Sequence, residues 1–357
     1  MDSKFFRLLR YSIDESQPAP IDITDSDCAQ LYRMATEQAL LGVMFRGISL
    51  LPDYKRLDRE VLMKWYTASR NIADLNMKVN RNAKRVANIF VRRGFRSCVL
   101  KGQGNALLYP DPYMRTPGDI DIWLEGGETR VLQLADKMSP HTKRCYHHVD
   151  FPSCGGIEVE VHYRPSFMNN LFANDCLQRY FAATSDIQFS HFVSLPDGVG
   201  QIAVPTASFN RIFQMAHISN HFFHEGIGLR QLLDYYYVLK QGFTDDDKQR
   251  DAAIFRFCGL YKIATAVMYV EQTVFGLEDS YLIVPPDSKR GRFLLTEIMR
   301  SGNFGQYDER INKARNNPIA RNLHRCLRDL RFTIMFPSEC LWEPIFRCYH
   351  FFWRRLH

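Results

Sequence analysis

The sequence predicts an α+β protein in which a mixed α/β core lies between two helical regions. Residues 26–95 carry apolar side chains at helical spacing, residues 97–163 consist of short apolar runs separated by glycine and proline turns, and helical spacing returns after residue 207. We therefore divide the chain into an N-terminal helical region (1–94), an α/β core (95–205) and a C-terminal helical region (206–357).

The N-terminal region is predicted to be helical because its apolar residues recur every three or four positions without strand-like alternation. Pro52 ends the first part of this pattern, and the following Asp53 favours a turn. Gly94, which follows two arginines, is typical of the end of a helix. These signals predict a helical region that is interrupted at residues 50–53.

The central region changes to short strands and turns. An apolar run over residues 97–101 predicts a buried strand, and glycines and prolines separate it from the next predicted strand. The remaining predicted elements are a short helix at 103–108, a strand at 119–124, a helix at 130–138, and strands at 146–151 and 157–163 on either side of a Gly-Gly turn. Together they predict a compact α/β unit.

The rest of the chain is predicted to be helical after one further strand at 199–204. The predicted helices lie at 207–223, 226–240, 249–275, 290–300 and 318–335. We expect this larger helical region to shape the pocket for an acceptor substrate.

Composition and charge limit the class of protein. The 357 residues are 46% hydrophobic, which suffices for a packed core, and no run of about 18 apolar residues or cleavable leader pattern predicts a membrane span or secretory signal. Nine cysteines without a CxxC pair are interpreted as reduced thiols, so we expect a cytoplasmic protein.

The C-terminal part of the chain is basic, because from Lys289 onward 14 Lys and Arg outnumber 6 Asp and Glu. This basic stretch is either a solvated helix face or a surface for phosphates, an acidic partner or a membrane.

Asp119 and Asp121 are the first candidates for catalysis. They lie two positions apart in a predicted strand, so both carboxylates project to the same side. Like charges at this distance raise each other's pKa or need a cation, and oxygen-only sites suit Mg²⁺ that is shared with substrate phosphates. Glu158 and Glu160 form a second such pair on a later strand. Three or four converging acids predict a two-metal phosphoryl-transfer site.

A turn with two glycines precedes the acidic strand and comprises Lys101, Gly102, Gln103 and Gly104. A strand-to-helix junction offers free backbone N–H groups to a phosphate, and the glycines permit close approach. Lys101 suits a phosphate as a point charge, although a local salt bridge explains it equally well. The chain lacks both the complete GxGxxG fingerprint and the GxxxxGK[ST] motif here, which argues against Rossmann and P-loop proteins.

The segments LKGQGNALLYPDPYMRTPGDIDIWL and IEVEVHYRPSF resemble the uncharacterised bacterial nucleotidyltransferases of the DNA polymerase β-like superfamily. The shared pattern consists of Leu-Lys-Gly, Tyr-Pro, an arginine, Asp-x-Asp and a later acid-x-His-aromatic strand. In this chain these parts are Leu100 to Gly102, Tyr109-Pro110, Arg115, Asp119 with Asp121, and Glu160 to Tyr163. The His-rich stretch HISNHFFHEGIGLRQLLDYYYVL and the later FPSE extend the resemblance through the helical half.

The resemblance implies a polymerase β-like core that transfers a nucleoside monophosphate from an NTP to an acceptor hydroxyl with release of pyrophosphate. It implies that Asp119 and Asp121 bind two Mg²⁺ ions, and that Glu160 is the third ligand and base, with Glu158 as the alternative third acid. The implied nucleotide-binding residues are Lys101, Gly102, Gln103, Gly104 and Arg115. Gln103 departs from the superfamily's wider Gly-Ser motif, in which the serine touches the triphosphate.

The acceptor stays open between a small molecule, a protein side chain and an RNA end. The residues expected to line its pocket are Glu158, His162, His217, His221, Arg230 and Asp234. His217, His221 and His224 share one helical face, which would suit zinc if another ligand joined them, although such helices also pack on a partner or line a polar pocket. Arg230 and Asp234 are four residues apart, so an ordinary helix salt bridge is the alternative.

Two other functions remain open. A catalytically inactive member of the family would use the same acids to bind a nucleotide or a partner protein, for example in a toxin–antitoxin-like role. A nucleic-acid-binding protein would use the basic C-terminal third and show steep salt dependence. The terminal segment IFRCYHFFWRRLH is either an interfacial helix on anionic lipid or packed on the core, which we favour because its aromatic residues do not separate onto one face.

Overall fold

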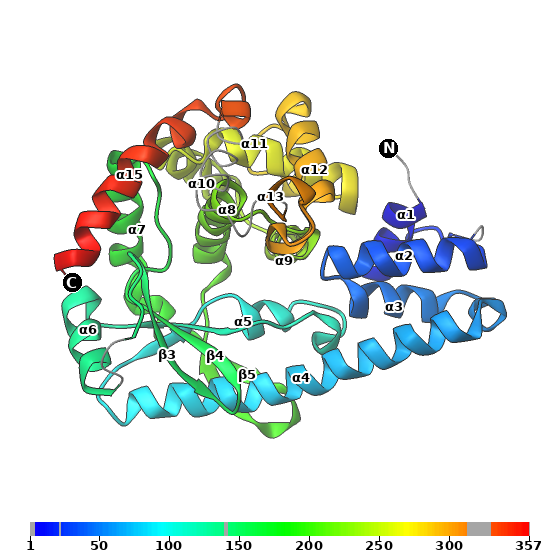
Figure 1. The fold of residues 1–357 in the computed structure, drawn as a ribbon, viewed down its shortest axis with the longest axis horizontal. Coiled ribbons are helices and arrows are strands. Elements are labelled where there is room, and N and C mark those ends of the chain that lie inside the picture. The colour runs from blue at the N-terminus through cyan, green and yellow to red at the C-terminus, as the bar shows by residue number, and fades with distance from the viewer. Residues whose placement is uncertain (1–3, 21–22, 139–141, 313–329, 357) are drawn as a thin grey trace.

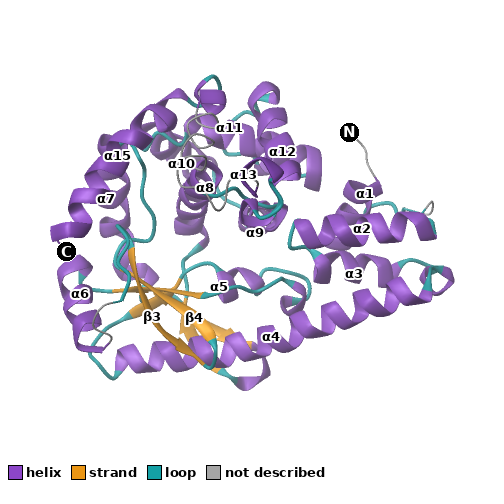
Figure 2. Cartoon of the chain, viewed as in Figure 1, coloured by secondary structure: helices purple, strands orange, loops and turns teal. Residues whose placement is uncertain are grey.

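The computed structural model describes residues 4–20, 23–138, 142–312 and 330–356. It combines many helices with a four-stranded sheet and a two-stranded hairpin, which confirms the predicted α+β class (Figure 1). Figure 2 shows the sheet between one long helix and the layer of C-terminal helices. Within the described residues, no helix combines the length and apolar character needed to cross a membrane.

The N-terminal region is helical, as predicted, and breaks after Leu51. Its helices are α1 (Lys4–Ile13), α2 (Asp25–Glu37), α3 (Leu41–Leu50) and the long α4 (Arg59–Val91). Asp58 begins α4, because its carboxylate accepts a hydrogen bond from the backbone N–H of Val61 at 2.8 Å. Gly94 adopts a φ of +77° just after α4, as expected for a glycine at a helix end. Helix α1 and the break between α2 and α3, where Ala39 has a φ of +55°, were not predicted.

The four strands of the sheet lie in the order β1-β2-β4-β3. They are β1 (Ser97–Val99), β2 (Ile120–Leu124), β3 (His148–Cys154) and β4 (Ile157–His162), with α5 (Gly102–Ala106) and α6 (Gly127–Met138) in the connections. β2 is parallel to β4, whereas β1 and β3 run antiparallel to their neighbours. The register places Asp121 beside Glu160 and Glu160 beside Asp150, so three carboxylates lie in one row.

Alternation along the strands gives the sheet one apolar and one polar face. Ile122 and Val161 belong to a buried core that they share with Val79 and Phe90 of α4. Burying each of these side chains contributes about 1.5–3 kcal/mol relative to leaving it in water. The opposite face carries the acids, so apolar packing on α4 fixes the strands whose other side holds the candidate site.

One helix, α7 (Leu171–Gln188), and a hairpin of β5 (Phe192–Leu195) and β6 (Gly200–Ala203) follow the sheet before residue 206. The C-terminal region that follows is helical and contains α8 (Ala207–His224), α9 (Leu229–Lys240), α10 (Asp245–Phe257), α11 (Tyr261–Val270), α12 (Ser288–Ser301), α13 (Glu309–Asn312) and α15 (Pro337–Leu356). The single helix predicted at 249–275 is wrong, because Gly259 with a φ of +70° separates α10 from α11. The helix predicted at 318–335 lies mostly outside the described residues, and α7 and β5 were not predicted.

Helix α15 packs its terminal aromatic residues against the sheet side of the molecule. Phe346 and Trp353 are buried in the same core as the apolar face of the sheet, and the indole N–H of Trp353 donates to Glu128 Oε1 at 3.1 Å. Phe351 and Phe352 remain exposed. The prediction that the C-terminal segment packs on the protein is therefore confirmed for one face of the helix.

Candidate active site

A cavity of about 480 Å³ is lined by the polar face of the sheet on one side and by helices α8 and α9 on the other. The sheet side contributes Lys101, Gly102, Asp119, Asp121, Glu160 and His162, and the helices contribute Gln214, His217, Asn220, His221, Arg230 and Asp234. The cavity therefore brings together most of the residues that the sequence singled out.

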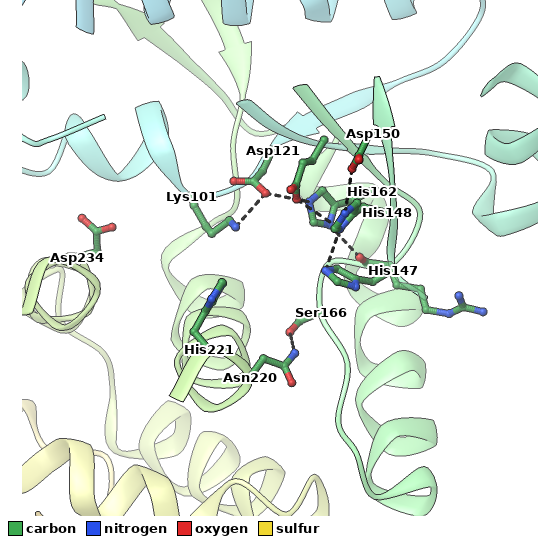
Figure 3. A network of polar contacts seen from close by, with 12 residues as sticks. Lys101, Asp121, His147, His148, Asp150, His162, Ser166, Asn220, His221 and Asp234 are labelled. Atoms are coloured by element: carbon green, nitrogen blue, oxygen red, sulfur yellow. Dashed lines mark hydrogen bonds and ion pairs between the residues drawn. The ribbon is translucent and has the colours of Figure 1, made fainter. Parts of the chain in front are cut away.

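Lys101 connects β1 to α5 with an unusual backbone. Its φ of +50° and ψ of −142° are rarely adopted by residues other than glycine, at a cost of about 1–3 kcal/mol. This conformation is accompanied by an ion pair of 2.9 Å between the Lys101 ammonium and Asp121 Oδ1 (Figure 3). Burial lowers the pKa of Lys101, but the charges of Asp121 and Asp119 outweigh burial and raise it. A strained lysine thus holds a permanent positive charge at the cavity wall.

The pKa values of Asp119 and Asp121 are shifted in opposite directions. Burial raises the pKa of Asp121, but Lys101 and His162, whose Nε2 lies 2.9 Å from Asp121 Oδ1, hold that pKa well below its usual range. The pKa of Asp119 is raised to about 6, first by the charge of Asp121 and then by burial. The acids therefore carry more negative charge than the adjacent lysine neutralises.

Glu160 extends this group of acids toward two histidines. Its Oε2 lies 3.5 Å from His162 Nε2 and 3.3 Å from His148 Nδ1. Asp121, Glu160 and His162 each offer a potential ligand atom within 4.8 Å of the others. Burial lowers the pKa of His162, but its hydrogen bonds to Asp121 and Glu160 outweigh burial and raise the pKa to about 9. Without a metal ion, His162 is an imidazolium between two carboxylates.

Only one of the two candidate glutamates lies in the cavity. Glu158 is exposed and precedes Val159, the first residue of β4 that pairs with β2, so no strand neighbour directs it toward Asp121. Glu160 is paired in register with Asp121 and lines the cavity. The geometry thus favours Glu160 as the third acid, and Glu158 does not contribute to the predicted acceptor pocket.

Two residues of the glycine-containing turn face away from the cavity. The side chain of Gln103 is buried and donates a hydrogen bond to Asn80 of α4. Gly104 packs on Val204, since a Cβ at this position would lie 3.0 Å from that side chain. Neither residue lines the cavity, whereas Gly102, with a φ of +44°, does. The expectation that Gln103 and Gly104 contact the nucleotide is therefore not supported, because both are used for packing.

Arg115 and Asp234 form a closed ion pair within the cavity wall. Arg115 donates from Nε to Asp234 Oδ1 and from Nη2 to Oδ2, each at 2.7 Å, and the Tyr109 hydroxyl donates to Oδ1 at 2.7 Å. The predicted nucleotide-binding arginine thus has a protein partner. In the described structure Arg230 does not pair with Asp234 but donates from Nη1 to the carbonyl of Thr116 at 3.0 Å, so the alternative of a helix salt bridge is wrong.

The histidines of α8 face the cavity but do not form a metal-ligand group among the described residues. The rings of His217 and His221 lie 4.2 Å apart, His221 contacts Glu225, and His224 contacts the carbonyl of Asn220. A different histidine group has the close spacing of metal ligands and comprises His147, His148 and His162. Sequence reasoning missed His147 and His148, although the His-His dipeptide inside the predicted strand at 146–151 was the available signal.

The comparisons with known proteins agree with the class that this site suggests, that of the nucleotidyltransferases. Residues 24–276 match the model of a family described as "Uncharacterised nucleotidyltransferase". The chain belongs to this family of nucleotidyltransferases.

Solved structures add only a distant likeness. The crystal structure of an antigenic nucleotidyltransferase-like protein from Paracoccidioides brasiliensis is 12% identical in sequence, with 59% of this chain and 97% of that chain covered and a TM-score of 0.30. No curated protein matches the chain significantly.

Proposed function

We propose that this protein is a metal-dependent nucleotidyltransferase that moves a nucleoside monophosphate from an NTP to an acceptor hydroxyl and releases pyrophosphate. The observation that carries the proposal is the convergence of Asp119, Asp121 and Glu160 on one cavity beside the ammonium of Lys101. Family membership supports the same reaction class.

The acids fit a divalent cation. The raised pKa of Asp119 reflects repulsion from Asp121, and such repulsion is relieved by a cation between carboxylates. Asp119, Asp121 and Glu160 would hold Mg²⁺, which accepts oxygen ligands and is commonly shared with substrate phosphates. When bound, such ions stabilise the charge on the attacking and leaving oxygens of an in-line displacement.

The cationic residues of the cavity suit a triphosphate. Lys101 would exchange its contact with Asp121 for a phosphate oxygen as the acids bind cations. Arg230 is buried, lines the cavity, and has no hydrogen-bond partner for its Nε within the described residues. Its charge would stabilise either the leaving pyrophosphate or an anionic group of the acceptor. Arg115 acts indirectly, because its pair with Asp234 holds one wall of the cavity.

Glu160 is the proposed proton acceptor for the attacking hydroxyl. Burial raises the pKa of Glu160, but the hydrogen bond from His162 outweighs burial and lowers it, so the carboxylate is ionised at neutral pH. The acceptor would approach along α8, where His217 and His221 face the acids across the cavity. These polar side chains favour an acceptor with several hydrogen-bonding groups around its hydroxyl.

The test is a screen of purified protein with Mg²⁺ and each α-³²P-labelled NTP in cell extract. The matched variants are Asp119→Asn/Asp121→Asn, which should abolish transfer, and Glu158→Gln, which removes a nearby carboxylate outside the cavity. Label in one acceptor species with the wild type and Glu158→Gln but not with the double variant supports the proposal. Transfer that survives in the double variant would exclude the proposal. It would also be excluded if none of the proteins transfers label and none binds Mg–NTP.

A further inference from the structure

We infer a transition-metal site, best suited to Zn²⁺, formed by His147, His148 and Glu160 with His162 as the fourth neighbour. The site lies where β3 and β4 face the cavity. It shares Glu160 with the proposed catalytic acids, but its occupancy does not depend on nucleotide transfer.

The spacing of the donor atoms is that of metal ligands. His148 Nδ1 lies 3.0 Å from His147 Nε2 and 3.3 Å from Glu160 Oε2, and Glu160 Oε2 lies 3.5 Å from His162 Nε2. Zinc–nitrogen bonds of about 2.0–2.1 Å in a tetrahedron require neighbouring donors at about 3.4 Å. The three measured spacings bracket this value, and the three histidines each offer a nitrogen within 4.8 Å of the others.

The donor types select against magnesium. Mg²⁺ takes oxygen ligands almost exclusively, whereas imidazole nitrogens suit zinc and its neighbours in the first transition row. Asp119 and Asp121 form an oxygen-rich half of the cavity wall, and His147 and His148 form a nitrogen-rich half. Two cations of different character would therefore occupy adjacent positions, with Glu160 between them.

The surroundings of the histidines also match those of metal ligands. His148 Nε2 lies 3.4 Å from Asp150 Oδ1, which is the carboxylate–histidine arrangement that orients zinc-bound imidazoles. His162 Nδ1 lies 3.3 Å from the carbonyl of Arg164, which leaves Nε2 directed at the donor group. A hydrogen bond between His147 and His148 would explain only the contact between these two rings. It would not explain why the carboxylate of Asp150 lies beside His148 Nε2 and that of Glu160 beside His148 Nδ1.

The backbone holds these donors rigidly. His148 is paired with His162, and Asp150 with Glu160, across the antiparallel β3–β4 ladder. Figure 3 shows the three rings of His147, His148 and His162 gathered below Asp150. Because the donors line the cavity, an ion and a water molecule can reach them. A site with three of these ligands would leave a position open for an oxygen of the acceptor.

The test measures zinc binding to the metal-stripped full-length chain by competition with a chromophoric chelator, without nucleotide. We expect about one tightly bound zinc in the wild type, and an affinity at least about 100-fold weaker in His147→Asn/His148→Asn. His191→Asn is the matched control, because His191 contacts the carbonyl of Val204 and does not line the cavity. Asp119→Asn should lose nucleotide transfer yet keep zinc, which separates this site from the proposed function.

A cobalt spectrum makes the test independent of variant folding. Co²⁺ bound to the wild type should show the intense visible absorption of a four-coordinate nitrogen-containing site, and Zn²⁺ but not excess Mg²⁺ should remove it. A weak spectrum typical of an oxygen-only octahedral site would overturn the inference. An equal zinc affinity in the wild type and the folded double-histidine variant would overturn it as well.

Discussion

Two pairs of opposite charge line the same cavity, Lys101 with Asp121 on the sheet and Arg115 with Asp234 against α9. Asp234 accepts a bidentate contact from Arg115 and a third hydrogen bond from Tyr109, so the pair is matched in charge and geometry. Asp121, Asp119 and Glu160 instead share two cations, Lys101 and the imidazolium of His162, so three carboxylates face two positive charges. We conclude that the α9 pair stabilises the cavity, while the sheet pair leaves negative charge available for cations.

The largest effect should follow from removing an acid at the sheet. Asp121→Asn should lower kcat/KM for transfer by about 10³-fold, or about 4 kcal/mol, because the metal-binding charge is lost. The free energy of unfolding should fall by much less than this, because the asparagine still accepts a hydrogen bond and Asp119 still lies near Lys101. Steady-state assays and urea denaturation on the same preparation check both statements. A loss of stability in proportion to the loss of activity would assign Asp121 a structural role.

The α9 pair should respond in the opposite way. Asp234→Ala leaves the Arg115 guanidinium buried without its partner, which should lower the free energy of unfolding by about 3–5 kcal/mol. The protein that remains folded should keep most of its Mg–NTP affinity, as measured by calorimetry at low temperature. Unchanged stability together with lost NTP affinity would show that the two pairs are functionally alike.

The charge of Lys101 is expected to matter for the nucleotide. Lys101→Met should weaken kcat/KM for the NTP by about 10- to 100-fold, because a charge-assisted contact to phosphate contributes about 1.5–3 kcal/mol. Lys101→Arg keeps the positive charge on a side chain of different length, so its kcat/KM for the NTP should fall less. If both variants transfer at the wild-type rate, Lys101 serves only to neutralise Asp121.

The two ends of the cavity should also differ in the sign of their pH dependence. The pKa of Asp119 is raised to about 6 from 3.8, mainly by Asp121, so this group favours folding at low pH and loses that contribution as pH rises through about 6. Burial raises the pKa of Asp234, but Arg115 outweighs it and lowers the pKa, so its contribution is present above 3.8 and is lost on acidification. In the metal-free wild type, Asp119 should therefore lower the free energy of unfolding by about 1–2 kcal/mol as the pH rises from 4 to 7. The Asp119→Asn variant should not show this decrease. An unchanged slope would show that the Asp119 carboxylate does not feel Asp121.

The smallest effect is expected for Glu158→Gln. The side chain is exposed and outside the cavity, so transfer should stay within about twofold of the wild type and stability within about 0.5 kcal/mol. The matched Glu160→Gln variant should lose transfer strongly. Equal losses in both variants would remove the distinction between the two acids.

Local pattern was enough to predict the strands of the core and the acids on them. The alternation of Asp119 to Leu124 and the apolar run before Lys101 are properties of a few neighbouring residues, and the structure confirms both strands. Helix α7 was missed because exposed apolar residues such as Phe172 and Ile187 obscure the stripe of buried Ala173, Leu177 and Phe181. The break at Gly259 was missed because a single glycine inside a helical pattern is often tolerated.

The partners within the site could not be predicted, because they are set by distant parts of the chain. Arg115 and Asp234 are 119 residues apart in the sequence, and nothing local makes Arg115 choose Asp234 over a nucleotide. Gln103 likewise turns toward Asn80 because α4 lies behind it. The closeness of His148 and His162 follows from the β3–β4 register, which the sequence does not specify.

The most direct measurement compares α-³²P-ATP with γ-³²P-ATP, and then the other NTPs, in parallel reactions with the same extract and Mg²⁺. Transfer of a nucleoside monophosphate requires that the acceptor gains the α label and never the γ label, and that labelled pyrophosphate appears only from the γ-labelled donor. We expect this pattern in the wild type and no labelled acceptor with Asp119→Asn/Asp121→Asn. An acceptor that carries the γ label would show that the acids serve phosphoryl transfer of a different kind and would contradict the assignment of this site as a nucleotidyltransferase centre.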